Sequence, residues 1–495
     1  MASGFLQKAL EAQDRRDHHT ALAYFRQVLA DEPRNWVGHT GLGNSLRALG
    51  QLDDAIAACT RGVEVAGGSL PAWTQLGLAY QAKGLWAEAR LCLGRACHIE
   101  PASADAHNNL AALELLADDP AAAELAARQA LTVAPGHARA AINLGRARKE
   151  QGALGEAIAL YQRALGIEPG NVDAGWNLGL ALLQEERWEE GWPRHELRSA
   201  IPEAPADVPR WDGRPLDGGR LLVQAEKGLG DTIHFARYVR LLKAQAGAGR
   251  VVVECQPALR RLLVRCDGVD DVVPRGDALP AVDACVAMMS LPLLLRSFDP
   301  TLTATAHYLT AEPALVARWK AELRRRQGND APAIGIVWQG NPAYQADHRR
   351  SLPLATLVPV IERARQLGFA VYSLQKGPGS EQLRGLPARL AVDELGSALD
   401  AGRAMGSAFV DTAAVMANLD VVITSDTAIP HLGGALGVPV WLLLAHLPDW
   451  RWGRRGQQTP WYPSLKLHRQ PHPGDWAAVM VDVCAALPHL ERKRS

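Results

Sequence analysis

The residues best suited to chemistry lie in one short turn near the C-terminal end of the chain. The turn reads Ser-Asp-Thr-Ala-Ile-Pro-His at residues 425–431 and follows an apolar run at residues 421–424. Small and hydroxyl side chains between a strand and a helix leave backbone N–H groups free to contact a phosphate. The turn therefore predicts an anion-binding site, with Ser425, Asp426, Thr427, Ala428 and His431 as its candidate residues. For His431, a buried and hydrogen-bonded histidine is an equally good interpretation.

Cationic residues follow two further apolar runs of the same region. Gly340 and the pair Arg349 and Arg350 come after the run at residues 334–338, and Lys376 comes after the run at residues 371–374. Guanidinium groups bind diphosphate oxygens in a bidentate way. We expect the arginine pair to help neutralise a diphosphate, with Gly340 and Lys376 as further candidates for phosphate binding, although a solvated loop is the alternative interpretation of the arginine pair.

A candidate acid–base residue lies earlier in the chain, at Asp231. It ends the sequence Glu-Lys-Gly-Leu-Gly-Asp at residues 226–231, which follows an apolar run at residues 221–225. One interpretation is a general base that takes a proton from an acceptor hydroxyl. The other is a helix N-cap, for which Asp is a favoured residue. The residues alone leave the two interpretations open.

These candidate residues require two successive α/β halves to position them. Short apolar runs alternate with amphipathic stretches in residues 220–312, the half that carries Asp231, and in residues 330–490, the half that carries the anion-binding turn. A proline- and glycine-rich segment at residues 201–219 reads as an inter-domain linker. Two halves joined in this way form a cleft that can hold two substrates.

The first 200 residues follow a 34-residue period. Pro33, Pro101, Pro135 and Pro169 fall on one lattice, and Gly67 occupies the vacant point. This is the period of the tetratricopeptide repeat (TPR), a helical hairpin that must stack on its neighbours to bury its small residues. The sequence predicts an α-helical TPR superhelix of five repeats and a partial sixth over residues 1–200.

Side-chain amides recur at one position of the repeats. Asn109, Asn143 and Asn177 occupy it in consecutive repeats, and Gln75 occupies it in the third repeat. The position lies on the first helix of each hairpin, where stacked amides can bind the backbone of an extended peptide. The pattern resembles the asparagine ladder of O-GlcNAc transferase. Alternatively, these amides form only local hydrogen bonds.

The C-terminal half resembles glycosyltransferase family nine, the heptosyltransferases. The stretch at residues 422–437 is similar to that family's donor motif, and Gly230–Asp231 matches its catalytic Gly-Asp. The resemblance implies a GT-B fold, which is a double Rossmann arrangement. It also implies that Asp426 binds sugar hydroxyls, that Thr427, Ala428 and His431 lie by the diphosphate, and that Asp231 is the base. Arg350 aligns with a phosphate-binding lysine of the family, and Ala428 replaces a glycine.

Two tryptophan-rich segments near the C-terminus look like those of a bacterial group that fuses TPRs to this domain. They read Pro-Asp-Trp-Arg-Trp-Gly at residues 448–453 and Pro-Trp-Tyr-Pro at residues 460–463. Their tryptophans either stack on a base or sugar or pack domain interfaces. The second of these roles is the more common one.

Three functions are consistent with these features. The favoured one is an inverting, metal-independent protein O-glycosyltransferase that uses a nucleotide sugar and a polypeptide held in the TPR groove; resemblance suggests flagellin or an adhesin as acceptor. The second is a cell-surface polysaccharide or lipopolysaccharide transferase, and the third is a non-catalytic TPR scaffold. The amide pattern favours the first over the second.

Composition narrows the choice of partners and compartment. Lys plus Arg equals Asp plus Glu, at 53 each, so bulk charge gives no reason to expect nucleic acid. The seven cysteines are scattered and favour reduced thiols in the cytoplasm. No apolar run is long enough to span a bilayer. The sequence contains neither Asp-x-Asp nor His-Glu-x-x-His, which favours a site without metal or cofactor other than the nucleotide sugar.

Overall fold

The computed structural model describes residues 2–199, 201–304, 307–328, 331–344, 346–390, 392–400 and 407–490. Residue 330, the expected start of the second α/β half, lies outside these ranges. The chain divides into two compact units, Met1–Ala181 and Leu182–Ser495. This boundary falls earlier than the one expected near residue 200. The two units are described separately.

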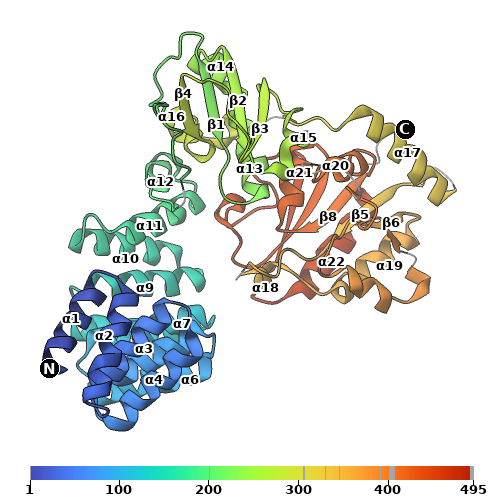
Figure 1. Ribbon diagram of the computed structural model, residues 1–495. Coiled ribbons are helices and arrows are strands. Elements are labelled where there is room, and N and C mark those ends of the chain that lie inside the picture. The colour runs from blue at the N-terminus through green and yellow to red at the C-terminus, as the bar shows by residue number, and fades with distance from the viewer. Residues whose placement is uncertain are drawn as a thin grey trace. The chain divides into compact units, whose positions relative to one another are not determined.

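The N-terminal unit is a stack of antiparallel helix pairs with the predicted 34-residue spacing (Figure 1). The pairs are α1 (Ala2–Asp14) with α2 (His18–Asp31), α3 (Trp36–Ala48) with α4 (Leu52–Val65), α5 (Leu70–Ala82) with α6 (Trp86–Ile99), α7 (Ala104–Leu116) with α8 (Pro120–Val133), and α9 (Ala138–Glu150) with α10 (Leu154–Ile167). Helix α11 (Val172–Gln184) begins the sixth repeat. The prediction of a TPR superhelix is confirmed.

Small residues explain how closely the two helices of a repeat approach each other. A Cβ atom on Gly77 would lie 2.7 Å from Cγ of Leu93, and one on Gly145 would lie 2.6 Å from Cε1 of Tyr161. Larger residues at these glycines would push the hairpin apart, because a packed interior has no room for the extra atoms.

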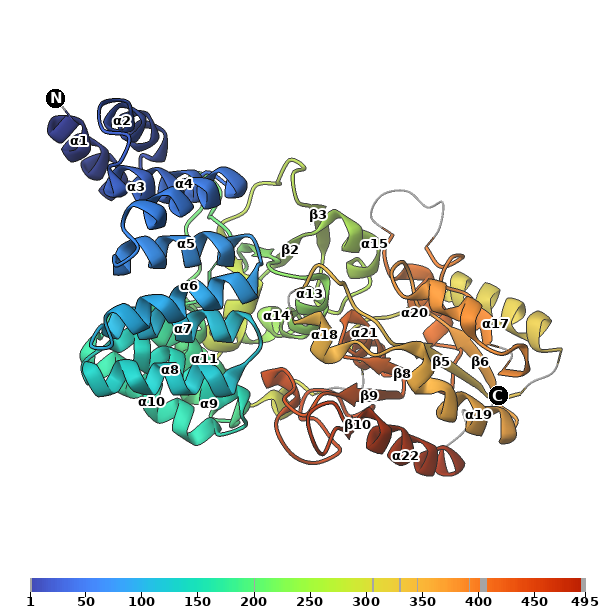
Figure 2. The same ribbon diagram turned by 90° about the horizontal axis from the view of Figure 1, so that it is seen from below.

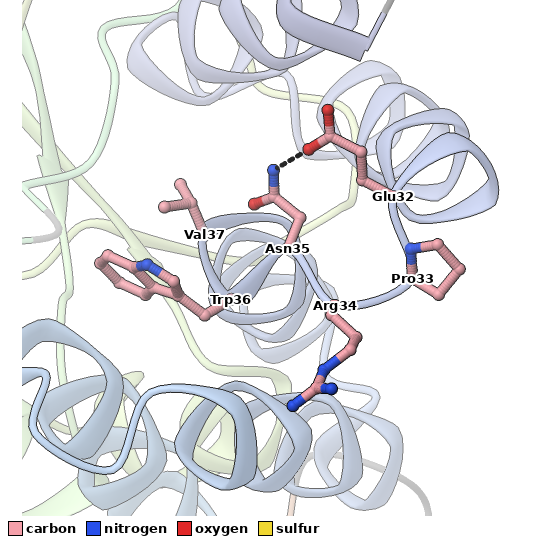
Figure 3. A pocket seen from close by; sticks show the side chains of 6 residues that line it. All are labelled: Glu32, Pro33, Arg34, Asn35, Trp36 and Val37. Carbon is pink, nitrogen blue, oxygen red and sulfur yellow. Dashed lines mark hydrogen bonds between the residues drawn. The ribbon is translucent and has the colours of Figure 1, made fainter.

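Turns between repeats are fixed by local capping. Asn35, in the turn before α3, accepts a hydrogen bond from the Gly38 N–H at 2.9 Å and donates one to Glu32 at 2.8 Å (Figure 3). A surface pocket of about 520 Å³ surrounds this turn and is lined by Glu32, Pro33, Arg34, Asn35, Trp36 and Val37. The side-chain amide of Asn35 is used by these hydrogen bonds, so we assign no ligand to the pocket.

The C-terminal unit contains two parallel sheets. The first has strand order β3-β2-β1-β4 and the second has strand order β10-β9-β8-β5-β6-β7. The first comprises β1 (Arg220–Gln224), β2 (Arg250–Cys255), β3 (Asp271–Pro274) and β4 (Ala284–Ala287), with helices α13 (Leu229–Phe235), α14 (Leu241–Ala246), α15 (Arg260–Leu263) and α16 (Leu291–Leu294). Helix α12 (Trp188–His195), which completes the sixth repeat in sequence, belongs to this unit.

The second sheet follows the strand order of doubly wound α/β folds. Its strands are β5 (Ala333–Val337), β6 (Ala370–Ser373), β7 (Val392–Glu394), β8 (Val421–Ser425), β9 (Val440–Leu444) and β10 (Leu465–Arg469). Its helices are α17 (Pro313–Gln327), α18 (Asp347–Arg350), α19 (Val358–Gln366), α20 (Val410–Met416), α21 (Ala428–Leu436) and α22 (Trp476–Ala486). Helices α19 and α22 cover one face, where Ile361 and Val483 share a core with Ile336 and Ile423.

Segment 201–219 is more than a linker. Its residues Ala204 and Val208 pack against the core of the first sheet at Leu222 and Cys285. The Trp211 N–H donates to the Cys285 carbonyl at 2.8 Å, so the segment also pairs with the edge of this sheet. The apolar side chains among its prolines therefore complete a sheet face that would otherwise be exposed to water.

The sequence prediction differed from the structure at several element boundaries. The sequence pattern after Asp231 predicts one helix as far as about Leu242, whereas the structure divides this segment into α13, a 3₁₀ turn and α14. Arg349 and Arg350, expected in a loop, lie in the short helix α18, and strands β7 and β10 were not predicted. These elements are short, so few residues carry their pattern.

The helices in the described part of the chain are all too short or too polar to cross a membrane.

Candidate functional site

Two strand-to-helix turns meet in the C-terminal unit. One joins β1 to α13 and the other joins β8 to α21; Figures 1 and 2 show these two helices side by side. The contact is close, because a Cβ atom on Gly230 would lie 3.3 Å from both Cα of Ala428 and Cδ2 of His431. In the second sheet, the β8 turn lies where the strand order reverses between β5 and β8, and such switch points bind ligands in parallel sheets.

Asp231 lies at this contact and uses both carboxylate oxygens. Oδ2 accepts a hydrogen bond from the Gly228 N–H at 3.0 Å. Gly228 is the N-cap of α13, so Asp231 caps the helix from its third position instead of being the N-cap itself. Oδ1 accepts a hydrogen bond from Arg451 at 2.5 Å. Each carboxylate oxygen has a second lone pair, so capping leaves Asp231 able to accept a proton.

Arg451 is a site residue that the sequence did not single out. Its side chain is about one-tenth exposed and lies between two carboxylates, Asp231 at 2.5 Å and Asp449 at 2.9 Å. Its guanidinium also stacks over Trp450, with 4.6 Å between Cζ and the ring centre. Asp231 comes from the first half and Arg451 from the second, so this ion pair joins the two halves at the site.

The Asp426 carboxyl group is partly buried at the end of β8. Burial, reinforced by the negative charge of Asp449, raises the pKa of Asp426 to about 7. Arg350 and Arg451 oppose this shift. The nearby indole of Trp452 also opposes the rise in the pKa of Asp426. Asp426 can therefore both donate and accept hydrogen bonds near neutral pH.

Arg350 is held beside the site by its own helix. Its Nε donates to Asp347 at 2.9 Å, and its guanidinium lies 4.6 Å above the ring of Tyr344. Gly340 makes room for this arrangement, because a Cβ there would lie 3.0 Å from Nη2 of Arg350. The Gly340 N–H donates to Ser351 at 2.8 Å. Gly340 was predicted to be a phosphate-binding residue, but its N–H is used by Ser351, and the glycine instead makes room for Arg350.

The β8 turn supplies a helix N-terminus. Thr427 is the N-cap of α21, and its hydroxyl accepts a hydrogen bond from the Ile429 N–H at 3.2 Å. Ala428 is the first residue of the helix and is partly exposed. Ser425 differs from the expectation, because its hydroxyl is buried at the end of β8 without a hydrogen-bond partner in the described structure. The Ser425 hydroxyl is thus not placed to contact a ligand.

His431 is buried on α21, next to this turn. Its Nδ1 lies 3.0 Å from the hydroxyl of Tyr462, and its ring stacks on Trp452 with 5.1 Å between ring centres. Burial, and then the charge of Arg451, lowers the pKa of His431 well below its usual value. At neutral pH the imidazole is therefore uncharged.

Lys376 lies at a different place from Arg350. Its Nζ donates to the Leu399 carbonyl at 2.8 Å and to Asp400 at 3.1 Å. It helps to line a cavity of about 680 Å³ at the ends of β6 and β7. Lys376 is therefore held at the ends of β6 and β7 by its own hydrogen bonds.

The late tryptophans pack against one another instead of facing outward. Trp450, Trp452 and Trp461 are all buried. Trp192 of α12 meets Trp450 edge to face at 5.6 Å and Trp461 at 6.5 Å. The packing alternative is therefore the one observed, and α12 is anchored on the site-bearing segments.

The recurrent amides of the repeat unit do not form a continuous contact among the described residues. Asn143 donates to Asn108 at 2.9 Å, the residue before the predicted Asn109. Asn109 is partly buried, and Asn177 donates to the Asp173 carbonyl at 2.8 Å within its own helix. The carbonyl oxygen of Gln75 is buried without a partner in the described structure. For Asn177, the structure therefore shows the local hydrogen bond of the alternative interpretation.

Residues from distant segments complete the site. Arg451, Asp449, Tyr344 and Tyr462 gather around the two turns, although no motif marked them as functional. The density of tryptophan and charge in residues 448–453 was the available signal, since such a segment must bury its rings and place its charges together. In the described ranges, no group of three or more His, Cys, Asp or Glu side chains is placed to hold a metal ion.

Comparison with known proteins supports the repeats. Residues 6–69 match a tetratricopeptide repeat family model and residues 145–185 match a TPR repeat model. Protein FlbA of Caulobacter vibrioides is 28% identical over 330 residues, which cover 62% of this chain and 53% of FlbA. The chain thus spans about half the length of this curated relative.

Solved structures with similar segments include one that is described as a TPR protein. The MamA protein is 24% identical, with 34% of this chain and 92% of MamA covered and a TM-score of 0.30. A TPR protein of Thermus thermophilus is 23% identical, with 37% and 100% covered and a TM-score of 0.34. The helix pairs and the two matching family models identify the N-terminal part of the chain as a TPR superhelix, a fold that typically binds protein partners.

Proposed function

We propose that the chain is a protein O-glycosyltransferase. It would move a sugar from a nucleotide-sugar donor to a Ser or Thr of a polypeptide recruited by the repeats. The observation that carries this proposal is the contact between the two turns, which brings Gly230, the neighbour of Asp231, against Ala428 at the N-terminus of α21. Under this proposal the two parallel sheets are the halves of a GT-B fold, and the reaction takes place in the cytoplasm.

Each group at the two turns has a chemical role in this reaction. The donor diphosphate would lie at the N-terminus of α21, where free N–H groups and the helix dipole favour an anion, with Arg350 as an additional cation. Asp426 would bind a hydroxyl of the sugar. Asp231 would take the proton of the acceptor hydroxyl as its oxygen bonds to the anomeric carbon.

The leaving group departs from the opposite side of that carbon. The bond between the anomeric carbon and the diphosphate oxygen breaks as the new bond forms, which inverts the configuration. Arg350 and the α21 N-terminus stabilise the negative charge that develops on the diphosphate. Arg451 keeps the Asp231 carboxylate oriented through its 2.5 Å hydrogen bond.

Release of nucleoside diphosphate tests the proposal. The full chain is incubated with a panel of nucleotide sugars and with the polypeptide that it captures, and the mass of that polypeptide is measured. We expect one donor to give both nucleoside diphosphate and a mass increase of one sugar. The Asp231→Asn variant should lose both, and Asp277→Asn, a change at an exposed aspartate, should keep both. Equal activity of Asp231→Asn and wild type would contradict the proposal.

A protein-interaction scaffold without catalysis is the second candidate. The two TPR matches favour it, because they account for protein binding without any chemistry at the second unit. This candidate predicts that no donor of the panel releases nucleoside diphosphate while the polypeptide is still captured.

A further inference from the structure

A buried hydrogen-bond network lies directly behind the two turns. The hydroxyl of Tyr462 is 3.0 Å from Nδ1 of His431 on α21 and 3.1 Å from Nδ1 of His234 on α13. All three side chains are buried. One hydroxyl therefore holds an imidazole from each of the two helices that form the site.

Both imidazoles are uncharged at neutral pH. Burial, and then the charge of Arg237, lowers the pKa of His234 well below its usual value, and the pKa of His431 is lowered by burial and by Arg451. A neutral imidazole has one N–H and one nitrogen with a free lone pair. The network must therefore specify which nitrogen of each ring carries the proton.

Arg237 fixes the proton on His234. Its Nη2 lies 3.5 Å from Nδ1 of His234, and an arginine can only donate. The guanidinium is held there by hydrogen bonds to the carbonyls of His234 at 2.9 Å and Trp461 at 2.7 Å, and it stacks 4.2 Å above the ring of Tyr462. Nε2 of His234 is buried without a hydrogen-bond partner among the described residues, so the contact with Arg237 is what distinguishes the two nitrogens, and it assigns the lone pair to Nδ1.

Tyr462 passes this constraint to His431. Its hydroxyl faces the lone pair of His234 at 3.1 Å, so it must donate its single proton there. The hydroxyl of Tyr308, 3.5 Å away, donates to the Ile233 carbonyl at 2.8 Å. The remaining contact at 3.0 Å then requires that Nδ1–H of His431 donates to the Tyr462 oxygen. Nε2 of His431 is left with the lone pair.

We propose that His431 accepts a hydrogen bond from a substrate hydroxyl through Nε2, and that Tyr462 is the residue that positions it for this. Nε2 lies on the ring edge away from Tyr462. The adjoining Cδ2 would be 3.3 Å from a Cβ on Gly230, next to Asp231. This inference rests on the proposed function, because the hydroxyl belongs to the donor sugar or to the acceptor.

The proposal changes the role implied by the family resemblance. An uncharged nitrogen with a lone pair repels the oxygens of a diphosphate, whereas it attracts the O–H of a sugar or of a Ser or Thr. His431 therefore distinguishes hydroxyl from phosphate at the site, and the phosphate is left to Arg350 and the α21 N-terminus.

Nitrogen NMR of the ligand-free full chain tests the tautomer directly. Histidine is labelled with ¹⁵N, and the signals of His431 are assigned by their loss in His431→Gln. We expect a protonated Nδ1 and an unprotonated Nε2 at pH 7, and we expect Tyr462→Phe to abolish this single pattern. A protonated Nε2 in the wild type would overturn the proposal.

Calorimetric titration with UDP, GDP, ADP and CDP separates the two possible ligands of His431. In His431→Ala, affinity for the nucleoside diphosphate that binds wild type should change by less than about twofold. Sugar transfer should fall by about tenfold or more, the equivalent of one lost hydrogen bond to a polar group. His431→Gln, whose amide oxygen can accept, should retain more transfer than His431→Leu.

The titration also distinguishes this inference from the function on which it rests. A tenfold loss of diphosphate affinity in His431→Ala would show a phosphate ligand and overturn the inference alone. Failure of wild type to bind any of the four diphosphates would contradict the proposed function, and with it the substrate role of His431, while the NMR spectrum would still decide the tautomer.

Discussion

The two units of the chain bury different kinds of side chain. The core of the repeat unit is rich in alanine, and its one deeply buried acid, Glu114 at 3% exposure, pairs with an arginine that is half exposed. The C-terminal unit buries whole ion pairs, such as Arg198 with Glu226, and the lone guanidinium of Arg237. Buried charges cost stability unless they are paired, so the C-terminal unit carries a cost that the repeat unit largely avoids.

The largest expected effect contrasts two buried glutamates. Glu226 accepts two hydrogen bonds from Arg198, at 2.8 and 2.9 Å, and both side chains are fully buried. Glu226→Gln should lower the free energy of unfolding by about 3–4 kcal/mol, because it removes one of the two carboxylates that neutralise a fully buried guanidinium and leaves only Glu196, at 2.7 Å. Glu114→Gln should cost about 1 kcal/mol, since Arg90 can turn to water. Urea unfolding of the full chain measures both, and equal losses would break the comparison.

Asp426 gives a pH-dependent contrast within the C-terminal unit. Its folded pKa of about 7 is above its unfolded value of 3.8, so the folded state favours the protonated form. The resulting stabilisation is complete below about pH 4 and is lost as pH rises through 7. Asp426→Asn should therefore be more stable than wild type by about 2–4 kcal/mol at pH 8, and the difference should shrink towards pH 4. A difference independent of pH would contradict the assigned burial effect.

Two glycines of the repeat unit test how closely its helices are packed. A Cβ on Gly145 would meet Tyr161 at 2.6 Å, whereas one on Gly166, also helical, would meet nothing within 4 Å. Gly145→Ala should destabilise the repeat unit by about 1–3 kcal/mol through overpacking. Gly166→Ala should stabilise it by up to about 1 kcal/mol through helix propensity. Thermal unfolding followed by circular dichroism distinguishes the two, and shifts of the same sign would refute the close-packing explanation.

The smallest expected effect concerns the amides of the repeats. Asn143 donates to Asn108, and its own carbonyl oxygen is left to accept from a peptide N–H. Asn143→Ala should weaken binding of the captured polypeptide by about 1 kcal/mol, or roughly fivefold. Gln7→Ala, at an exposed glutamine of α1, should leave affinity unchanged. Unaltered affinity of Asn143→Ala would remove the repeat amides from the binding surface.

The two units also differ in how much of their structure could be predicted from the sequence. A fixed period places Gly77 opposite Leu93 and Gly145 opposite Tyr161, so the repeat fold follows from local spacing. The two turns were also recognisable, because glycine, aspartate and threonine have specific roles between a strand and a helix. The pairing of Arg451 with Asp231 could not be recognised, since the two residues are 220 positions apart in the sequence and meet only in the folded chain. Ser425 was predicted to contact a ligand because of its place in the turn, but it is the last residue of β8 and its hydroxyl is buried.

The proposed sugar transfer depends most directly on an anion site where the two turns meet. Calorimetric titration of the full chain with nucleoside diphosphates tests this site with Arg350→Ala beside Arg389→Ala, a change at an exposed arginine paired with Glu362. We predict that one diphosphate binds wild type and Arg389→Ala with equal affinity and binds Arg350→Ala about tenfold or more weakly. Equal binding to all three proteins, or binding to none of them, would contradict the account.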